Sequence, residues 1–273
     1  MVMLDLVCKK FPKRELIIAT FDHGTRESSK DDADFVAEVC KRQGLDARRG
    51  EAKLGEGVSE DSAREVRYGF LRDIAKRENG EIWTAHHLDD LVESVAINFV
   101  RGTGIRGLAA LNAPNVRRPF VDGTFGEVFD KRAILKYAAE NATMFRQDPT
   151  NVSDGYLRNR LRVKISTMTN AKKLKIYQLW QAQKGIIDEI NKVIDDLIPK
   201  DLRFERAWFL ELDDEVAMEI LRVALIRANI MATRPQILDF LKAIREYAPG
   251  KKFNLPKDNL VQIRRSDFKL KMC

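Results

Sequence analysis

The chain has few cysteines and no cysteine pair. Its 273 residues include only Cys8, Cys40 and Cys273, and none of these stands in a C-x-x-C arrangement. Zinc ribbons, dithiol redox sites and iron–sulfur clusters, which use that spacing, are therefore not indicated. An odd number of cysteines without a spacing pattern is typical of a reducing compartment, so we expect a cytoplasmic location.

Long apolar runs are also missing. No run approaches the ~18 residues that a membrane-spanning helix needs. The opening residues MVMLDLVCKKF have no basic residue ahead of their apolar positions, unlike a secretory signal. We therefore expect no membrane partner. Lys and Arg outnumber Asp and Glu by 48 to 41, giving a formal net charge of +7, which weakly indicates an anionic partner.

The order of expected elements predicts an α/β fold. Residues 15–21 and 81–85 are short apolar runs of the kind that form buried strands. Residues 28–44 and 60–80 have helical periodicity, and each segment ends at a glycine. Strands and helices at this spacing predict a parallel sheet. The pattern after residue 170 is helical up to a strand-like tail around PKDN, so we expect domains at 1–170 and 171–273, the second smaller, mainly helical and ending in a β-hairpin.

The densest group of ionisable residues follows the second expected strand. The segment TAHHLDDLVES (84–94) holds two of the three histidines and three carboxylates. On a helix Asp90 and Glu93 are neighbours three positions apart, and His86 and His87 stand where the strand meets the helix. Ligands of an open parallel sheet bind at the carboxyl ends of its strands, so we expect the site here. The apolar face of the same helix would run through Leu88, Leu91, Val92, Val95, Ala96, Phe99 and Val100.

Residue chemistry leaves two functions open for this group. The carboxylates could bind a cationic substrate or Mg²⁺. Alternatively, His86 and Asp90, which have i, i+4 spacing, could ligate a catalytic metal with His23, as in a metal-dependent phosphoesterase. Such sites usually need more ligands than this chain offers. Acidic residues also favour the positive end of a helix dipole, but this explains the adjacent histidines poorly.

Two later segments are rich in arginine. Glycines in VRGTGIRGL (100–108) would let the backbone approach a phosphate closely. From Tyr156 to Ile187 there are eight basic residues and no acidic one. Such a stretch either follows a nucleic-acid backbone through arginine–phosphate contacts or is a solvated basic helix face.

Taken in order, these segments resemble one family. The motifs that carry the resemblance are FDHGTR, SAREVRYGFL, TAHHLDDLVES, RGTGIRGL, RRPF, DPTN and RNRLR. Their order and spacing are those of the tRNA(Ile)-lysidine synthetases of the PP-loop ATPase superfamily. The resemblance covers residues 1–165. It implies a Rossmann-like PP-loop domain, of the adenine nucleotide alpha hydrolase type, over 1–170 and an accessory domain over 171–273.

The resemblance implies an ATP-dependent ligase. With ATP and Mg²⁺, the family adenylates C2 of the wobble cytidine, C34, in tRNA(Ile) bearing the anticodon CAU. The ε-amine of free L-lysine then attacks that carbon and AMP leaves, which yields lysidine. The implied partners are that tRNA and lysine. The oligomeric state stays open, with a homodimer as one possibility.

The resemblance also assigns roles to individual residues. Asp90 and Glu93 would recognise lysine, while Arg67 would lie near the reacting nucleotide and stabilise charge on the transferred phosphate. His86 and His87 would stand beside the nucleotide as members of the catalytic group. The residues implied at the ATP pocket are His23 and Arg26, and those expected to contact tRNA are Arg101, Arg106, Arg158 and Arg160.

One defining motif of the family is not in the sequence. The loop Ser-Gly-Gly-x-Asp-Ser, whose amides hold the pyrophosphate of ATP, is missing together with the strand before it, and MVMLDLV resembles the helix that follows the loop. We expect an N-terminally truncated sequence or a misassigned start. The alternatives are a tRNA-binding paralogue without ATP chemistry, a metal-dependent phosphoesterase, and a tRNA thiolase, a class whose usual cysteine pairs are absent.

Overall fold

The computed structural model describes residues 1–24, 27–52, 55, 60–111, 113, 115–146, 157–256 and 258–271. The chain forms two compact units, Met1–Gln183 and Lys184–Cys273. The boundary between the units lies inside α8 (Asn170–Leu197), a helix that begins at the predicted domain boundary.

The first unit contains mainly helices and short strands that alternate along the chain. Its elements are α1 (Val2–Lys10), η1 (Lys13–Glu15), β1 (Ile17–Asp22), α2 (Glu27–Gln43), β2 (Asp46–Glu51), α3 (Glu60–Arg77), β3 (Ile82–Trp83), α4 (Leu88–Val100), α5 (Ile105–Leu108), β4 (Val116–Arg117), α6 (Lys131–Glu140), α7 (Leu157–Ser166) and the first half of α8.

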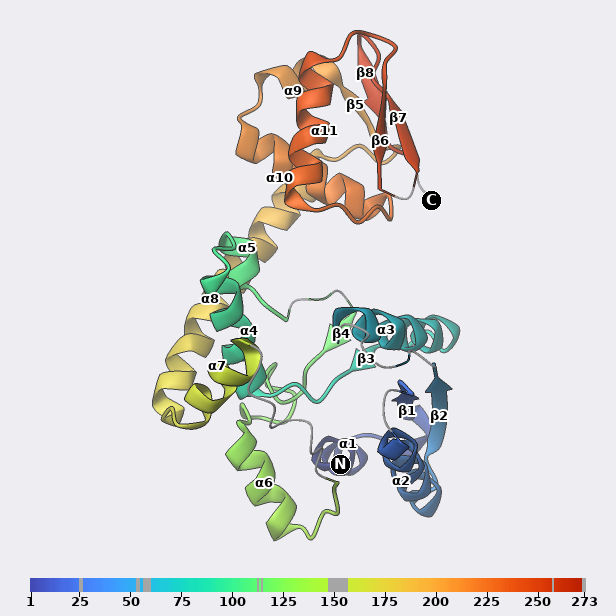
Figure 1. Ribbon diagram of the computed structural model, residues 1–273, viewed down its shortest axis with the longest axis vertical. Coiled ribbons are helices and arrows are strands. Elements are labelled where there is room, and N and C mark those ends of the chain that lie inside the picture. Colours follow the sequence, from blue (N-terminus) through green and yellow to red (C-terminus); the bar gives the residue numbers. More distant parts are fainter. Residues whose placement is uncertain are drawn as a thin grey trace. The chain divides into compact units, whose positions relative to one another are not determined.

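The strands of this unit form two parallel pairs (Figure 1). In the first pair β1 lies beside β2, with Ile17 opposite Asp46. In the second pair β3 lies beside β4, with Trp83 opposite Arg117. This confirms the expected α/β fold with parallel strands. A cavity of about 950 Å³ is lined by residues of both β1 and β3.

The start of α4 is fixed by its own sequence. His87 is the N-cap residue, and the Asp90 carboxylate accepts the backbone N–H of His87 at 2.9 Å. Such a bond satisfies a donor that the helix itself leaves unpaired. Leu88 and Leu91 are fully buried behind the cap. The strand β3 therefore leads into a helix whose first turn has a defined orientation.

The apolar face of α4 is shorter than the sequence pattern predicts. Leu88, Leu91 and Val92 pack in one cluster with Ile165 and Trp180, among others. The predicted continuation of this face is wrong, because Phe99 is 74% exposed and Val100 is exposed as well. The buried partners of α4 lie along its first turns and leave its last turn uncovered.

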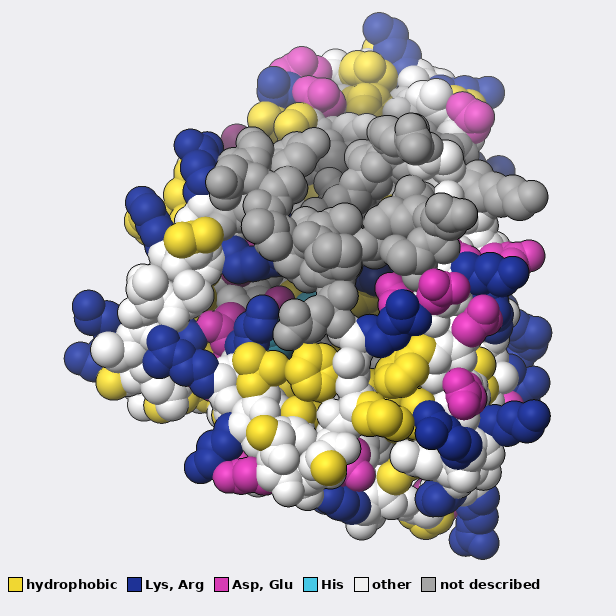
Figure 2. Space-filling view, turned by 60° about the horizontal axis from the view of Figure 1, so that its bottom comes forward, with side chains coloured by type: hydrophobic (Ala, Val, Ile, Leu, Met, Phe, Trp, Pro, Cys, Tyr) yellow, Lys and Arg dark blue, Asp and Glu magenta, His cyan; other side chains and the backbone are white. Residues whose placement is uncertain are grey.

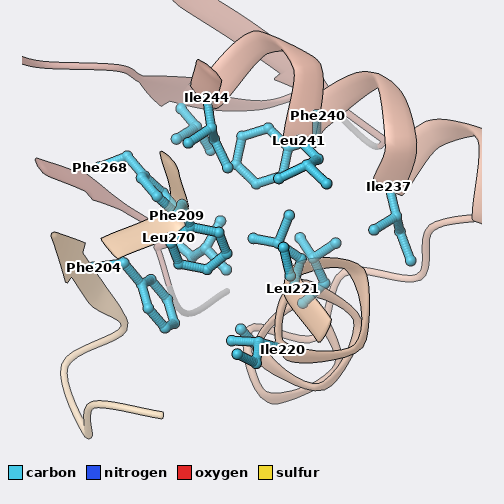
Figure 3. Packing of buried hydrophobic residues seen from close by; sticks show 14 of the residues in the cluster. Phe204, Phe209, Ile220, Leu221, Ile237, Phe240, Leu241, Ile244, Phe268 and Leu270 are labelled. Atoms are coloured by element: carbon cyan, nitrogen blue, oxygen red, sulfur yellow. The ribbon is translucent and has the colours of Figure 1, made fainter. Parts of the chain in front are cut away.

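The second unit has its own apolar core. Its elements are the rest of α8, β5 (Arg203–Glu205), α9 (Arg206–Glu211), α10 (Asp214–Arg227), α11 (Arg234–Glu246), β6 (Lys252–Leu255), β7 (Asn259–Gln262) and β8 (Asp267–Lys269). Phe204, Phe209, Leu221, Phe240 and Phe268 lie close together in this core (Figure 3). β6 and β7 form an antiparallel hairpin. β8 pairs with β5 from the start of the unit, a pairing that the sequence pattern did not indicate.

Within the described residues, no helix is long and apolar enough to cross a membrane.

Candidate active site

The site lies where β3 and β4 end. The two strands are parallel, so their carboxyl ends meet at one edge. The backbone N–H of Thr84 donates to the carbonyl oxygen of Arg117 at 3.0 Å, which brings the segment 84–87 beside Arg118. This is the edge at which open α/β sheets bind their ligands.

His86 is held at this edge as a neutral imidazole. Thr84 Oγ1 and His86 Nδ1 are 2.8 Å apart and share a hydrogen bond. Burial lowers the pKa of His86 to about 4; Asp90 opposes this shift, and Arg118, Arg64 and Arg67 add to it. His86 therefore carries no charge at neutral pH.

The negative charge of Asp89 is balanced by a buried lysine of this chain. Lys173, at the start of α8, is 1% exposed and forms an ion pair with Asp89, and its Nζ lies 3.6 Å from Asp130 Oδ2. Burial would raise the pKa of Asp89, but hydrogen bonds from His87, Lys173 and the backbone of Lys131 hold it well below its usual range. Asp89 is thus a charged group already paired within the protein.

Glu93 is also paired within the protein. Its side chain is 3% exposed and binds Arg158 directly, and Arg162 Nε lies 3.3 Å from its second oxygen. Both arginines belong to α7, which packs against α4. Glu93 therefore fastens α7 to the helix that carries the site, and its predicted role in lysine recognition stays a prediction.

Asp90 is the carboxylate of this group that lines the cavity, together with Arg67, Tyr68, Thr84 and His86. Its side chain is 27% exposed, and Oδ2 lies 3.5 Å from His87 Nε2. Among the described residues no Lys or Arg forms an ion pair with it. Of the three carboxylates of α4, Asp90 is thus the one that is able to receive a cation from the cavity.

Arginines of α3 gather around Tyr68, a buried residue of the same helix. The guanidinium carbons of Arg64, Arg67 and Arg72 lie 4.8, 5.8 and 5.9 Å from the centre of the Tyr68 ring. Arg64 Nη2 is 3.4 Å from the Tyr68 hydroxyl oxygen. The predicted nucleotide residue Arg67 is therefore part of a positively charged region that borders the cavity.

His23 directly follows β1 and reaches the same region. Its ring packs on Phe21 with centroids 5.0 Å apart. Burial lowers the pKa of His23, Arg67 lowers it further and Asp22 opposes the shift. His23 and Arg67, which come from different elements, are thus electrostatic neighbours. Arg26, the second predicted ATP-binding residue, lies outside the described residues.

The residues predicted to contact tRNA are placed differently from one another. Arg101 is exposed just after α4, and Arg106 is half-buried in α5. On α7, Arg158 and Arg162 are directed to Glu93, whereas Arg160 and Lys164 are exposed. Basic side chains also lie on many other parts of the face drawn in Figure 2, with acidic side chains between them.

Two buried cations of the site were not predicted from the sequence. Lys173 stands in the basic stretch that follows residue 156, and its apolar neighbours Leu174 and Ile176 were the available signal of burial. Arg118 belongs to the RRPF motif, to which no role was assigned. In the described residues, no group of three or more His, Cys, Asp or Glu side chains is arranged to hold a metal ion.

Comparison with solved structures shows the same fold in another protein. A similar fold occurs in the U34-tRNA thiolase NcsA from Methanococcus maripaludis, solved with its [4Fe-4S] cluster. That likeness has a TM-score of 0.53 and 18% sequence identity, and covers 66% of this chain and 67% of the thiolase chain. At this identity the likeness concerns the fold alone.

Sequence comparisons give the family. The chain is 30% identical over 233 residues to a tRNA(Ile)-lysidine synthase from Thermotoga maritima, covering 78% of this chain and 54% of the relative. It is 34% identical over 175 residues to a tRNA(Ile)-lysidine synthase from Thermosipho africanus, covering 60% and 40%. The chain thus spans about half the length of these curated relatives. Residues 1–169 match the family described as PP-loop domain, so the chain belongs to the PP-loop family and is a relative of the tRNA(Ile)-lysidine synthases.

Proposed function

We propose that this chain provides the nucleotide and lysine sites of an ATP-dependent tRNA(Ile)-lysidine synthase. Asp90 carries the proposal: it is a carboxylate on the cavity with no Lys or Arg partner among the described residues, and it stands beside Arg67 and His86. A charge of this kind suits an ammonium group of lysine. Membership of the PP-loop family and the named relatives support ATP and tRNA as the other substrates.

The proposed reaction has two balanced steps. First, the C2 oxygen of C34 attacks the α-phosphate of ATP, and pyrophosphate leaves. Next, the ε-amine of lysine attacks C2, the C2–O bond breaks, AMP leaves with that oxygen, and the amine loses its protons. Mg²⁺ accompanies the nucleotide and would offset phosphate charge. In this scheme Arg67 stabilises charge on the transferred phosphate, and His87 caps the helix that presents Asp90.

The remaining assignments belong to the same proposal. His23 and Arg26 border the ATP site, neutral His86 stands between nucleotide and lysine, and Glu93 holds α7 next to the lysine site. The RNA is the tRNA(Ile) with anticodon CAU, bound through Arg101, Arg106 and Arg160, while Arg158 acts through α7, which it anchors at Glu93. The protein works in the cytoplasm, where free lysine and tRNA are present. Light scattering would decide between a monomer and a homodimer.

A second candidate is a tRNA-binding protein without ATP chemistry. The observation that favours it is that Arg101, Arg160 and Lys164 are exposed and could contact phosphates of an RNA backbone without any ATP chemistry. Both candidates predict tRNA affinity that falls with salt. They differ in whether AMP is formed from ATP when lysine and tRNA are both present.

The test uses two proteins. One is the chain itself, and the other carries an added N-terminal strand and Ser-Gly-Gly-x-Asp-Ser loop. Radiolabelled lysine is followed into a tRNA(Ile) transcript with anticodon CAU, with a CAU transcript of the methionine tRNA as control. Incorporation that needs ATP, by either protein, supports the ligase. Binding of the transcript by both proteins without any incorporation would overturn the ligase in favour of the second candidate.

A further inference from the structure

Phe99 is a large aromatic side chain that the core of the first unit does not use. It stands in the last turn of α4 and is 74% exposed, and the next residue, Val100, is 61% exposed. Single exposed apolar residues are common on proteins, but here two large ones are adjacent on one turn. Water in contact with such a surface is unfavourable, so a partner that covers it would gain free energy.

The backbone around Phe99 is firmly held. The carbonyl oxygen of Phe99 accepts the N–H of Gly102 at 3.0 Å, and Gly102 has a φ of +65°, which ends the helix and turns the chain away. Asn98, the preceding residue, is tied to the loop that follows, because its side-chain N–H donates to the carbonyl oxygen of Gly107 at 2.6 Å. The Phe99 ring is therefore presented on a fixed backbone, as a binding platform requires.

The surroundings of this ring are basic. Residues 94–121 include four arginines and no acidic residue. Arg101, two positions after Phe99, is exposed, and no carboxylate among the described residues pairs with it. Ala110, in the same segment, binds the first half of α8, which has no acidic residue either. An exposed aromatic ring in such surroundings suits a partner that offers both flat apolar faces and negative charge.

Unpaired nucleotides of RNA have this combination. Their bases stack on aromatic side chains, and their phosphates bind arginine. A duplex stacks its bases on one another, so it presents phosphates without free base faces. A second copy of this chain fits less well, because a two-fold interface would bring the same basic surface against itself. The surface therefore favours single-stranded RNA over a protein partner.

We propose that Phe99 is a stacking platform for one unpaired base of a bound RNA, with Arg101 at a phosphate beside that base. The inference rests on the proposed function, because a tRNA substrate is what brings unpaired nucleotides to this surface. Arginine contacts to phosphates alone would hold a duplex and a loop alike. The Phe99 ring makes the surface prefer a loop.

The test measures the RNA affinity of the full chain by filter binding, with a tRNA(Ile) transcript bearing CAU and with an RNA duplex. Phe99→Leu keeps an apolar side chain but loses the ring. It should weaken binding of the transcript about 5-fold or more, as loss of one stacked base predicts, and leave duplex binding unchanged. Phe99→Trp should keep the affinity for the transcript. Phe145→Leu is the matched control, because Phe145 is also an exposed phenylalanine of the first unit, and it should change neither affinity.

Salt dependence separates stacking from charge. Phe99→Leu should keep the slope of log affinity against log salt concentration, because stacking releases no counterion. Arg101→Gln should reduce this slope by about one phosphate contact. A smaller slope in Phe99→Leu as well would show that Phe99 acts by placing the charged groups around it, and would overturn the platform.

The remaining outcomes each decide the question. Equal transcript affinity of wild type and Phe99→Leu would overturn the platform, and a loss in Arg101→Gln alone would leave the proposed tRNA contact standing. A wild type that binds neither RNA would overturn both. A dimeric wild type and a monomeric Phe99→Leu protein in light scattering would assign the surface to a second copy instead. Stacking that behaves as expected, in a protein that forms no lysidine, would uphold the platform and overturn only the ligase.

Discussion

The three carboxylates of α4 have the same chemistry but different surroundings. Asp89 meets Lys173, Glu93 meets two arginines of α7, and Asp90 faces the cavity. Sequence spacing treats Asp90 and Glu93 as one pair, since neighbours at i, i+3 share a helix face. Their partners come from α7 and α8, far along the chain, and only the folded structure separates their roles.

Replacing these two carboxylates should therefore have different effects. We expect Asp90→Asn to raise the KM for lysine about 30- to 150-fold, as loss of a charge-assisted contact of about 2–3 kcal/mol predicts. Its unfolding free energy should fall by only about 0.3–1 kcal/mol, because asparagine keeps an oxygen for the His87 N–H but loses the negative charge at the start of α4. The KM is measured by steady-state kinetics on a protein that is active in the lysine incorporation assay. The unfolding free energy is measured by urea unfolding.

Glu93→Gln should mainly reduce stability. It removes the carboxylate of Glu93 that Arg158 and Arg162 contact, and because both arginines keep access to water, we expect a loss of about 1–3 kcal/mol. Urea unfolding measures it. If Glu93→Gln instead raised the KM for lysine and kept full stability, the role of Glu93 as the anchor of α7 on α4 would be wrong.

His86 gives the protein a dependence on pH. The ordinary pKa of histidine is 6.5 and that of folded His86 is about 4. Between these values the unfolded chain binds more protons, so the free energy of unfolding should fall as pH drops from 6.5 towards 4. One such group changes it by at most about 1.4 kcal/mol per pH unit. Thermal unfolding of wild type and His86→Gln checks this.

The comparison isolates His86 because His23, whose pKa burial also lowers, is present in both proteins. We expect the curve of His86→Gln to be flatter than that of the wild type over this range. Parallel curves would show that His86 is not held neutral by the fold.

At the scale of elements, α7 divides its basic residues between two faces. Arg158 and Arg162 are directed to Glu93, while Arg160 and Lys164 are exposed. Residues two positions apart on a helix do not face the same way. Their alternation along the sequence, which suggested one basic surface, thus corresponds to an anchoring face and a solvent face.

Substitutions on the two faces should have different effects on tRNA affinity and on stability. We expect Arg160→Glu and Lys164→Glu to lower tRNA affinity and to reduce its salt dependence by about one phosphate contact each, with little change in stability. Arg162→Gln should lower stability more than affinity. Filter binding at several salt concentrations measures the tRNA affinity, and thermal unfolding measures the stability. If the Arg160 and Lys164 variants lost stability and the Arg162 variant lost affinity, the assignment of the two faces would be wrong.

The strands show how far the sequence could predict the fold. β1 and β3 were expected because their residues are apolar, but β2 was missed. Its sequence is DARRGE and most of its side chains are exposed, so no apolar pattern marks it. β4 has two residues, too few for any periodicity. These strands are fixed by backbone pairing with β1 and β3, which is a tertiary contact.

The position of the candidate site residues in the fold could be predicted from the sequence, but their ion-pair partners could not. The strand-to-helix position of His86, His87 and Asp90 follows from local sequence, and the structure places all three there. Lys173 could not be paired with Asp89 from sequence, because 84 positions separate them. Buried ion pairs between distant elements depend on packing, which no local pattern encodes.

At the scale of the whole molecule, α8 belongs to both units. Its first half contributes Leu174 and Trp180 to the core that contains α4. Its second half contributes Ile190 and Ile194 to the core of the second unit. Gly185, an exposed residue just after the boundary between the units, lies in the helix interior.

Gly185→Ala should stabilise the protein. An added Cβ would meet no atom within 4 Å, and alanine loses less conformational entropy than glycine in a helix, so we expect a gain of about 0.5–1 kcal/mol. Gly50→Ala is the contrasting change. Its Cβ would lie 2.6 Å from Phe21 Cδ2 and 2.9 Å from Phe70 Cδ2, which should cost about 1–3 kcal/mol.

Differential scanning calorimetry measures both variants. A destabilised Gly185→Ala protein would mean that α8 needs a flexible point at this position.

The shared helix also sets an order of events on the ribosome. Trp180 Nε1 donates to the carbonyl oxygen of Ala110 at 2.7 Å, and the Tyr177 hydroxyl donates to that of Val121 at 2.8 Å. The core of the first unit therefore lacks the contacts of Tyr177 and Trp180 until the chain has been synthesised past residue 180. Nascent chains generally fold domain by domain from the N-terminus. In this protein the first unit cannot finish folding until α8, which continues into the second unit, has left the ribosome. Completion of the first core therefore coincides with the start of synthesis of the second unit.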